Sequence, residues 1–227
     1  MKIGILQTGR APESLLQEHG DYDELFKKLL AGRGLEFVTY PVLDNVFPET
    51  SQECDGWLIT GSRFGVYEDH KWIVPLEEFL RHTYRARVPI VGVCFGHQIL
   101  AQALGGKVEK FSGGWSCGAV SYQGVTPDEK SQTVLAWHQD QVTQLPPGAA
   151  VIGRTDFCPY AMLAYGDQAL TAQPHPEFSA AFLRDLLAAR GHLLPEHIFQ
   201  HAEASLDDLS VDNDLADMFE EFFRRSR

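Results

Sequence analysis

The stretch from Val88 to Ala101 constrains the fold of this chain more than any other part of it. Its first half, Ile90–Val93, is apolar and mostly β-branched, which is typical of a buried strand. From His97 onward apolar residues recur at helical spacing, and the pair Gly105-Gly106 is expected to end the helix. The sequence therefore predicts a buried strand that turns directly into a helix.

Cys94 lies at the turn between this strand and this helix, with Gly92 and Gly96 on either side of it. Two glycines at that spacing suit a tight elbow, which has no room for side chains. A helix N-terminus carries partial positive charge, which favours a thiolate over a thiol. Its free N–H groups, beginning with that of Phe95, can face the oxyanion of a tetrahedral intermediate. We interpret Cys94 as a candidate nucleophile; the elbow alone leaves a buried structural cysteine as the alternative.

Charge and cysteine content narrow the classes of function. The 227 residues include 19 basic and 31 acidic side chains, giving a net charge of −12, which argues against a nucleic-acid partner. No apolar stretch is long enough to span a membrane, and the first residues do not resemble a signal peptide. The four cysteines lie far apart without a Cys-x-x-Cys motif. We therefore expect no metal, no cofactor and no disulfide, in a reduced, cytoplasmic compartment.

Strand-like and helix-like segments alternate up to Gly106, which predicts parallel strands joined by right-handed crossovers. Beyond Gly106 short strand-like runs predict antiparallel pairs added to the same sheet. Expected strands are 2–6, 35–39, 56–61, 90–93, 108–111, 119–125, 133–137, 149–154, 161–165 and 169–173. Expected helices begin near 22, 72, 97, 178, 195 and 213. The predicted class is α/β: a three-layer, open, mostly parallel sheet flanked by helices, with antiparallel extra strands and C-terminal helices. We expect one domain over 1–190 and a helical extension over 191–227 packed on it.

His175 is the candidate general base for the thiol. It lies between two prolines, directly after the expected strand 169–173, and open α/β sheets place their sites at the carboxyl ends of strands. Glu177 can hydrogen-bond to the second ring nitrogen and so set the tautomer. The alternative for His175 is an exposed loop residue, and the rival base His97 is expected to point elsewhere. We expect six further histidines at the surface: His19, His70, His82, His192, His197 and His201.

Three separated motifs resemble, in the same order, those of the class I glutamine amidotransferases. The run Gly92–Gln98, followed by Leu104-Gly105-Gly106, resembles the nucleophile motif of that family, and His175-Pro176-Glu177 resembles its second motif. The likeness spans residues 1 to 190 and is greatest to stand-alone proteins similar to the glutaminase half of GMP synthase. It implies the flavodoxin-like class I amidotransferase fold and a catalytic triad of Cys94, His175 and Glu177.

The resemblance also implies roles for groups around the triad. Thr60-Gly61-Ser62 resembles the loop whose Gly61 N–H completes an oxyanion hole with the N–H of Phe95. The stretch 137–142 resembles the segment that binds the amino and carboxylate ends of glutamine. The candidate substrate-binding residues are Gln98, His138 and Asp140, and its charge makes Asp140 the candidate for the substrate ammonium.

The activity implied is acyl transfer on a small molecule, and three interpretations remain open. The first is a glutaminase that hydrolyses the side-chain amide of glutamine through a γ-glutamyl thioester on Cys94 and passes ammonia to a separate synthetase. The second is a γ-glutamyl peptide hydrolase that uses the same triad on a larger amine. The third is a catalytically silent regulatory module, which the intact triad disfavours.

Some features depart from the family pattern or have no role that the sequence explains. Arg63 stands beside the oxyanion loop, where synthase-type glutaminases tend to carry a proline. The sequence contains no ATP-pyrophosphatase domain and no Ser-Gly-Gly loop, so we expect that it does not itself aminate an acceptor with ATP. The insert 113–118 and the tail after residue 190 have no role that follows from the sequence.

Overall fold

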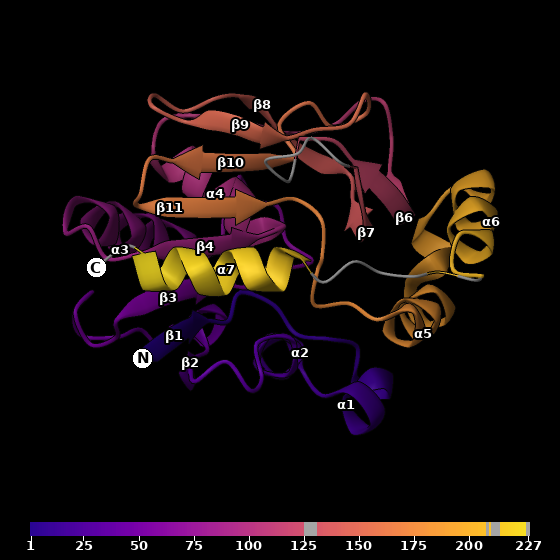
Figure 1. Cartoon of the computed structure of the whole chain (residues 1–227). Coiled ribbons are helices and arrows are strands. Elements are labelled where there is room, and N and C mark those ends of the chain that lie inside the picture. The colour runs from indigo at the N-terminus through magenta and orange to yellow at the C-terminus, as the bar shows by residue number, and fades with distance from the viewer. Residues whose placement is uncertain (125–130, 208, 210–213, 226–227) are drawn as a thin grey trace.

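A computed structural model describes residues 1–124, 131–207, 209 and 214–225. Within these ranges seven strands form the main sheet in the order β2-β1-β3-β4-β11-β10-β9 (Figure 1). The neighbours from β2 to β11 run parallel, and β10 and β9 extend the sheet antiparallel. The strands are β1 (Lys2–Leu6), β2 (Glu36–Tyr40), β3 (Gly56–Ile59), β4 (Ile90–Val93), β9 (Ala150–Gly153), β10 (Met162–Tyr165) and β11 (Ala169–Ala172).

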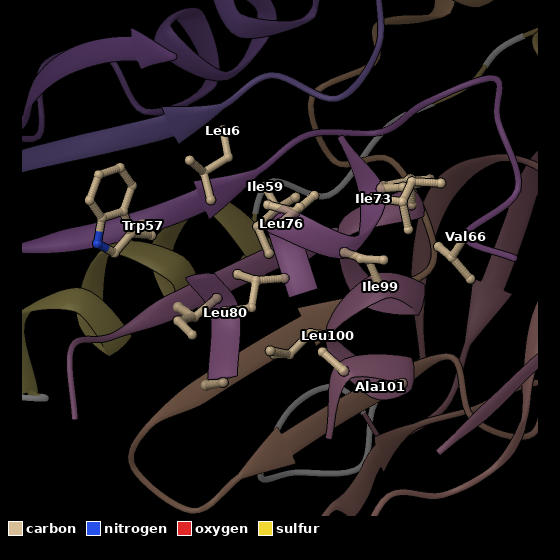
Figure 2. Close-up of a cluster of buried hydrophobic side chains, with 14 of the residues drawn as sticks. Leu6, Trp57, Ile59, Val66, Ile73, Leu76, Leu80, Ile99, Leu100 and Ala101 are labelled. Carbon is tan, nitrogen blue, oxygen red and sulfur yellow. The ribbon is translucent and has the colours of Figure 1, made fainter. Parts of the chain in front are cut away.

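Helices cover both faces of this sheet, which confirms the predicted three-layer α/β class. On one face α3 (Ile73–Arg85) and α4 (Phe95–Ala103) bury a cluster of side chains against the sheet. Figure 2 shows this cluster, whose labelled members are Leu6, Trp57, Ile59, Val66, Ile73, Leu76, Leu80, Ile99, Leu100 and Ala101. In α3 one stripe of residues meets the sheet, which explains the helical spacing of its apolar residues, whereas α4 is buried at every residue except Gln102.

The opposite face is covered by α2 (Tyr22–Leu29) and α7 (Asp214–Arg225), and α7 crosses in front of the sheet in Figure 1. The buried residues of α7 are Leu215, Ala216, Phe219 and Phe223. Their spacing places them on one side of the helix, where they share a core with strand residues such as Ile3 and Leu58. This part of the tail therefore contributes to the main core.

Two small antiparallel sheets stand beside the main one: β5 (Lys107–Lys110) pairs with β8 (Asp140–Gln144), and β6 (Ser116–Tyr122) pairs with β7 (Gln132–His138). The expectation that the strands at 108–111, 119–125 and 133–137 are added to the main sheet is wrong, because they correspond to β5, β6 and β7 of the two small sheets. The strands expected at 149–154 and 161–165 do join the main sheet, as β9 and β10. Strand β7 meets the segment after β11 through one isolated bridge, between Leu135 and His175. There the His175 N–H donates to the Leu135 carbonyl at 2.8 Å.

Some local predictions are corrected by tertiary packing. The short helix α1 (Glu13–His19) and the strand β8 were not expected from the sequence, and β6 begins inside the insert 113–118. His19 was expected at the surface but is buried, because α1 packs against α5 (Ala180–Arg190) and the His19 ring contacts Asp185 and Phe182. The other expected surface histidines are exposed or half-buried. Val125 and Asn213, the ends of an expected strand and helix, lie outside the described residues.

A third core lies between α1, α5, α6 (Glu196–Ala204) and the β6–β7 pair. At its centre Ala202 approaches β6 so closely that a Cβ on Gly118 would lie 2.9 Å from the Ala202 Cα. In the part of the chain that the structure describes, no helix has the length and apolar character that a membrane crossing requires.

Candidate active site

Three neighbouring parallel strands bring the predicted site residues together. Gly61 follows β3, Cys94 follows β4, and His175 follows β11, and these strands are adjacent in the sheet with their carboxyl ends at one edge. The Cys94 N–H donates to the carbonyl of Ala172 at 2.8 Å, which holds the elbow beside the segment that carries His175. The sheet topology thus assembles at one edge what lies far apart in the sequence.

The turn at Cys94 has the strained geometry that the two glycines predict. Cys94 has a φ of 52° and a ψ of −103°, and α4 begins at the next residue. A Cβ on Gly92 would lie 2.5 Å from the Gly96 carbonyl oxygen, and a Cβ on Gly96 would lie 2.5 Å from that of Ile59. A positive φ outside glycine is uncommon and costs energy, which the surrounding packing must offset. The elbow therefore fixes the sulfur at the helix N-terminus.

His175 lies between a thiol and a carboxylate. Its Nδ1 is 2.7 Å from Oε1 of Glu177, and its side chain also hydrogen-bonds to Cys94. The ring stacks on Phe178, with centroids 4.0 Å apart and planes 7° apart, which restricts its rotation. Burial lowers the pKa of His175, but the negative charges of Glu177 and Cys94 outweigh burial and raise this pKa to about 10. The geometry therefore favours an imidazolium beside the sulfur.

The residues of the proposed oxyanion hole lie next to Cys94. Gly61 lines the cavity, and a Cβ there would lie 2.9 Å from Cε1 of His175 and 3.7 Å from the Cβ of Cys94, so the backbone must approach closely. The Phe95 side chain is fully buried and packs against Trp72. Its backbone N–H is the first of α4, directly after the nucleophile position.

The predicted substrate-binding residues meet on the wall of the same cavity. Nε2 of Gln98 donates to the Asp140 carbonyl at 2.9 Å and to Oε1 of Gln173 at 3.0 Å, so both of its N–H groups are used. His138 is buried, and burial lowers its pKa to about 3, which keeps this ring neutral. Gln98 and His138 thus fix the backbone around Asp140 and add no charge.

Asp140 begins β8 and lines the cavity. Burial raises the pKa of its carboxyl, while a hydrogen bond from Tyr67 at 3.0 Å and the charge of Lys110 lower it. Among the described residues the Tyr67 hydroxyl is the one group that hydrogen-bonds to this carboxylate. A partly desolvated carboxylate with one donor retains the capacity to bind a cation.

The cavity has a volume of about 390 Å³ and includes groups that the sequence did not single out. They are Tyr22, Tyr67, Trp115, Trp137, Arg190 and Leu193. Trp137 begins the stretch 137–142 that resembles the glutamine-binding segment, but no motif marks the other five, which look like ordinary core or surface positions of unrelated segments. Their convergence depends on how α2, α5 and the β6–β7 pair pack at the end of the main sheet.

A possible ligand set for a cation exists away from this cavity. Glu18, His19 and Asp185 could offer ligand atoms within 4.8 Å of one another. His19 and Asp185 already form a 2.6 Å contact across α1 and α5, which accounts for the grouping as a link between helices. We assign no metal to it.

The match to a known protein family agrees with this arrangement of residues. The model of the glutamine amidotransferase class-I family matches residues 18–186, which is most of the chain. The chain belongs to the class I glutamine amidotransferase family. This confirms the family resemblance that the nucleophile and His-Pro-Glu motifs indicated.

Curated relatives carry two different activities in their names. "Gamma-glutamyl peptidase 5" of Arabidopsis thaliana is 28% identical over 209 residues, which cover 86% of this chain and 83% of the relative. "GMP synthase [glutamine-hydrolyzing]" of Bordetella parapertussis is 30% identical over 210 residues, covering 78% of this chain but only 38% of the relative. Among solved structures, a glutamine amidotransferase from Methylobacillus flagellatus superposes with a TM-score of 0.77 at 21% identity, covering 99% of this chain and 94% of that one. This last likeness confirms the fold.

Proposed function

We propose that this protein hydrolyses γ-glutamyl amides through a thioester on Cys94, with the side-chain amide of glutamine as the smallest substrate. The observation that carries the proposal is the chain of contacts from the Cys94 side chain through the His175 ring to Glu177, located at a helix N-terminus. A thiol, a base and a group that orients the base are what nucleophilic acyl transfer requires.

In the first half of the reaction the sulfur of Cys94 attacks the amide carbon, and a C–S bond forms. The backbone N–H groups of Gly61 and Phe95 stabilise the oxyanion, and loss of one such donor typically raises a barrier by about 3–4 kcal/mol. The imidazolium of His175 gives its proton to the amide nitrogen as the C–N bond breaks. Ammonia or an amine leaves, and the γ-glutamyl thioester remains.

In the second half water attacks the thioester carbon. His175, now neutral, takes a proton from this water, and the C–S bond breaks to release glutamate. Glu177 stabilises the imidazolium in both halves, which agrees with the raised pKa of His175. The net reaction consumes one amide and one water and needs no cofactor.

Asp140 is the proposed partner of the substrate ammonium. It is the partly desolvated carboxylate of the cavity wall that keeps a single hydrogen bond, from Tyr67. A charge-assisted contact of this kind contributes about 1.5–3 kcal/mol. The contact fixes the glutamyl half, so that the γ-carbonyl lies over the sulfur.

A second candidate, hydrolysis of γ-glutamyl peptides, has its own support. The cavity wall includes Tyr22, Trp115 and Arg190, which ammonia as a leaving group does not require. Transfer of ammonia to a separate synthetase belongs to the glutamine interpretation, which the name of the Bordetella relative favours. The two candidates share the thioester and differ in the leaving amine.

The test is to measure glutamate release by the purified protein from glutamine and from γ-glutamyl dipeptides. We expect release from at least one substrate, and Cys94→Ala should reduce it to background. Cys54→Ala is the matched control, because Cys54 is equally buried but packs in the core away from the cavity. Glutamate release that survives in Cys94→Ala would overturn the proposal.

A further inference from the structure

One group of cavity residues has no part in the reaction at the γ-carbonyl. Tyr22 is the first residue of α2, Arg190 is the last of α5, and Leu193 ends a short 3-10 turn after it. These elements are distinct from the ones that carry Asp140 and Gln98. The cavity therefore has a second wall, built by α2 and α5.

Arg190 brings a positive charge to this wall. Among the described residues no carboxylate forms an ion pair with it, whereas Arg184 on the same helix pairs with Asp207. Two other cations line the cavity, near the substrate-binding wall: the charge of Lys110 lowers the pKa of Asp140, and the Arg63 guanidinium lies 4.8 Å from the centroid of the Phe64 ring. In a chain with a net charge of −12, an unpaired, half-buried arginine calls for an anionic ligand.

Tyr22 lies within electrostatic reach of both Arg190 and Cys94. Burial raises the pKa of Tyr22 to about 12, Arg190 lowers it, and Cys94 and Glu177 raise it further. The hydroxyl therefore stays protonated at neutral pH and can donate a hydrogen bond. No described residue accepts one from it, so a donor and a cation share this wall without protein partners. A cation and a hydrogen-bond donor are the kinds of group that bind a carboxylate.

An apolar surface adjoins these polar groups. Trp115 and Trp137 are half-buried, both line the cavity, and their rings meet edge to face with centroids 6.3 Å apart. Indole rings in a cavity wall provide a rigid contact for an apolar side chain. A leaving amine with an apolar side chain and a carboxylate could contact both the indole rings and the polar groups of Arg190 and Tyr22.

We propose that Arg190 and Tyr22 form a subsite for the carboxylate of the leaving amine, so that the preferred substrates are γ-glutamyl peptides with a free C-terminal carboxylate. Trp115 and Trp137 contact the side chain of the departing residue. The inference rests on the proposed function, because the same thioester forms on Cys94. The amide nitrogen leaves as the α-amine of an amino acid, taking the proton of His175, and water completes the hydrolysis.

The test compares two substrates that differ only in the charge of the leaving group: γ-glutamyl-leucine and γ-glutamyl-leucine amide. For the parent protein we expect kcat/KM to be roughly ten- to a hundredfold higher for the free acid. Arg190→Met should bring this ratio close to one, and Tyr22→Phe should lower it by a smaller factor. The ratio of the two kcat/KM values is the right readout, because a merely structural defect lowers kcat/KM for both substrates by the same factor.

Arg85→Met is the matched control. Arg85 is the last residue of α3, so it has the same position at a helix end, but it is exposed and does not line the cavity. Its loss should leave the ratio at the parent value. If Arg190→Met does not fold, Tyr22→Phe carries the test alone, and an unchanged ratio in that variant overturns the subsite.

The failure of the subsite and the failure of the proposed function give different results. Hydrolysis of both substrates at equal rates by the parent, or a ratio that Arg190→Met leaves unchanged, overturns the subsite and upholds the thioester chemistry. No glutamate from either dipeptide or from glutamine overturns both.

Discussion

At the residue scale, the four cysteines differ in chemistry although all four are buried. Burial raises the pKa of Cys117 and of Cys158 to about 12 and also raises that of Cys54. Cys94 alone among the described residues hydrogen-bonds to an imidazolium at a helix N-terminus. We predict that iodoacetamide near neutral pH modifies Cys94 first, as peptide mapping after a brief exposure would reveal. Equally fast modification of Cys117 or Cys158 contradicts the assignment.

The second residue-scale prediction concerns the pH dependence that Glu177 sets. In the proposed reaction the imidazolium of His175 gives its proton to the leaving amine, so kcat/KM should fall as pH rises through about 10. Glu177→Gln removes a negative charge that raises this pKa, so the fall should move at least about one unit lower. Turnover should drop about 10²- to 10⁴-fold. A pH–rate profile of the variant with the alkaline limb unmoved would exclude Glu177 from this role.

Asp140 gives a prediction that separates binding from chemistry. Asp140→Asn removes the charge proposed to bind the ammonium, so KM should rise by roughly ten- to a hundredfold with kcat nearly unchanged. Because burial raises the pKa of Asp140, KM of the parent should also increase on acidification before the pH reaches the ordinary value of 3.8. Steady-state kinetics with Asp69→Asn, an exposed aspartate outside the cavity, provide the control. An unaltered KM for every γ-glutamyl substrate would place Asp140 outside the binding site.

At the element scale, the elbow between β4 and α4 holds β3, β4 and α4 in contact. Gly96→Ala would place a Cβ 2.5 Å from the Ile59 carbonyl oxygen, and neither backbone can move without separating α4 from β3. We expect a loss of roughly 1–3 kcal/mol in the free energy of unfolding, measured by denaturant titration.

Gly32→Ala is the comparison for this variant. Gly32 has a φ of +75° but open space around it. Gly32→Ala should therefore lower the free energy of unfolding only through the strained backbone conformation, by about 1 kcal/mol. Equal destabilisation by the two substitutions would mean that the close approach at Gly96 is not a significant constraint. Slower alkylation of Cys94 in Gly96→Ala would further indicate that the elbow positions the sulfur.

The elbow was predictable from the sequence because its determinants are local. The apolar run Ile90–Val93, the two glycines around Cys94 and the helical spacing that follows all lie in one short segment. The same holds for His175 and Glu177, which are two residues apart and fixed by prolines. These are the parts of the site that the sequence motifs predicted.

The second wall of the cavity was not predictable in this way. Tyr22 occupies a position that reads as the apolar face of α2, and Arg190 reads as an ordinary basic residue in the last turn of α5. Their approach to Cys94 depends on the packing of α2 and α5 at the edge of the sheet, which no local pattern encodes. For the same reason the sequence missed β8, whose pairing with β5 sets the position of Asp140.

At the scale of the whole molecule, the layers act together to place one thiol. The sheet brings β3, β4 and β11 side by side, the β6–β7 pair is held over their ends by the Leu135–His175 bridge, and α5 adds Arg190. The chain belongs to the class I glutamine amidotransferase family, and the cavity wall supplies the contacts that would select the leaving amine in the proposed acyl transfer.

If the proposed mechanism holds, Cys94 becomes γ-glutamylated during turnover, and mass spectrometry can detect this acyl-enzyme. The protein would be mixed with excess γ-glutamyl substrate, quenched in acid within the first turnovers, and digested to locate the modification. We expect an added mass of one glutamyl group on the peptide that contains Cys94, lost on treatment with hydroxylamine and absent in Cys94→Ala. Turnover without any acylated Cys94, or a glutamyl group on another residue, would contradict the proposed mechanism.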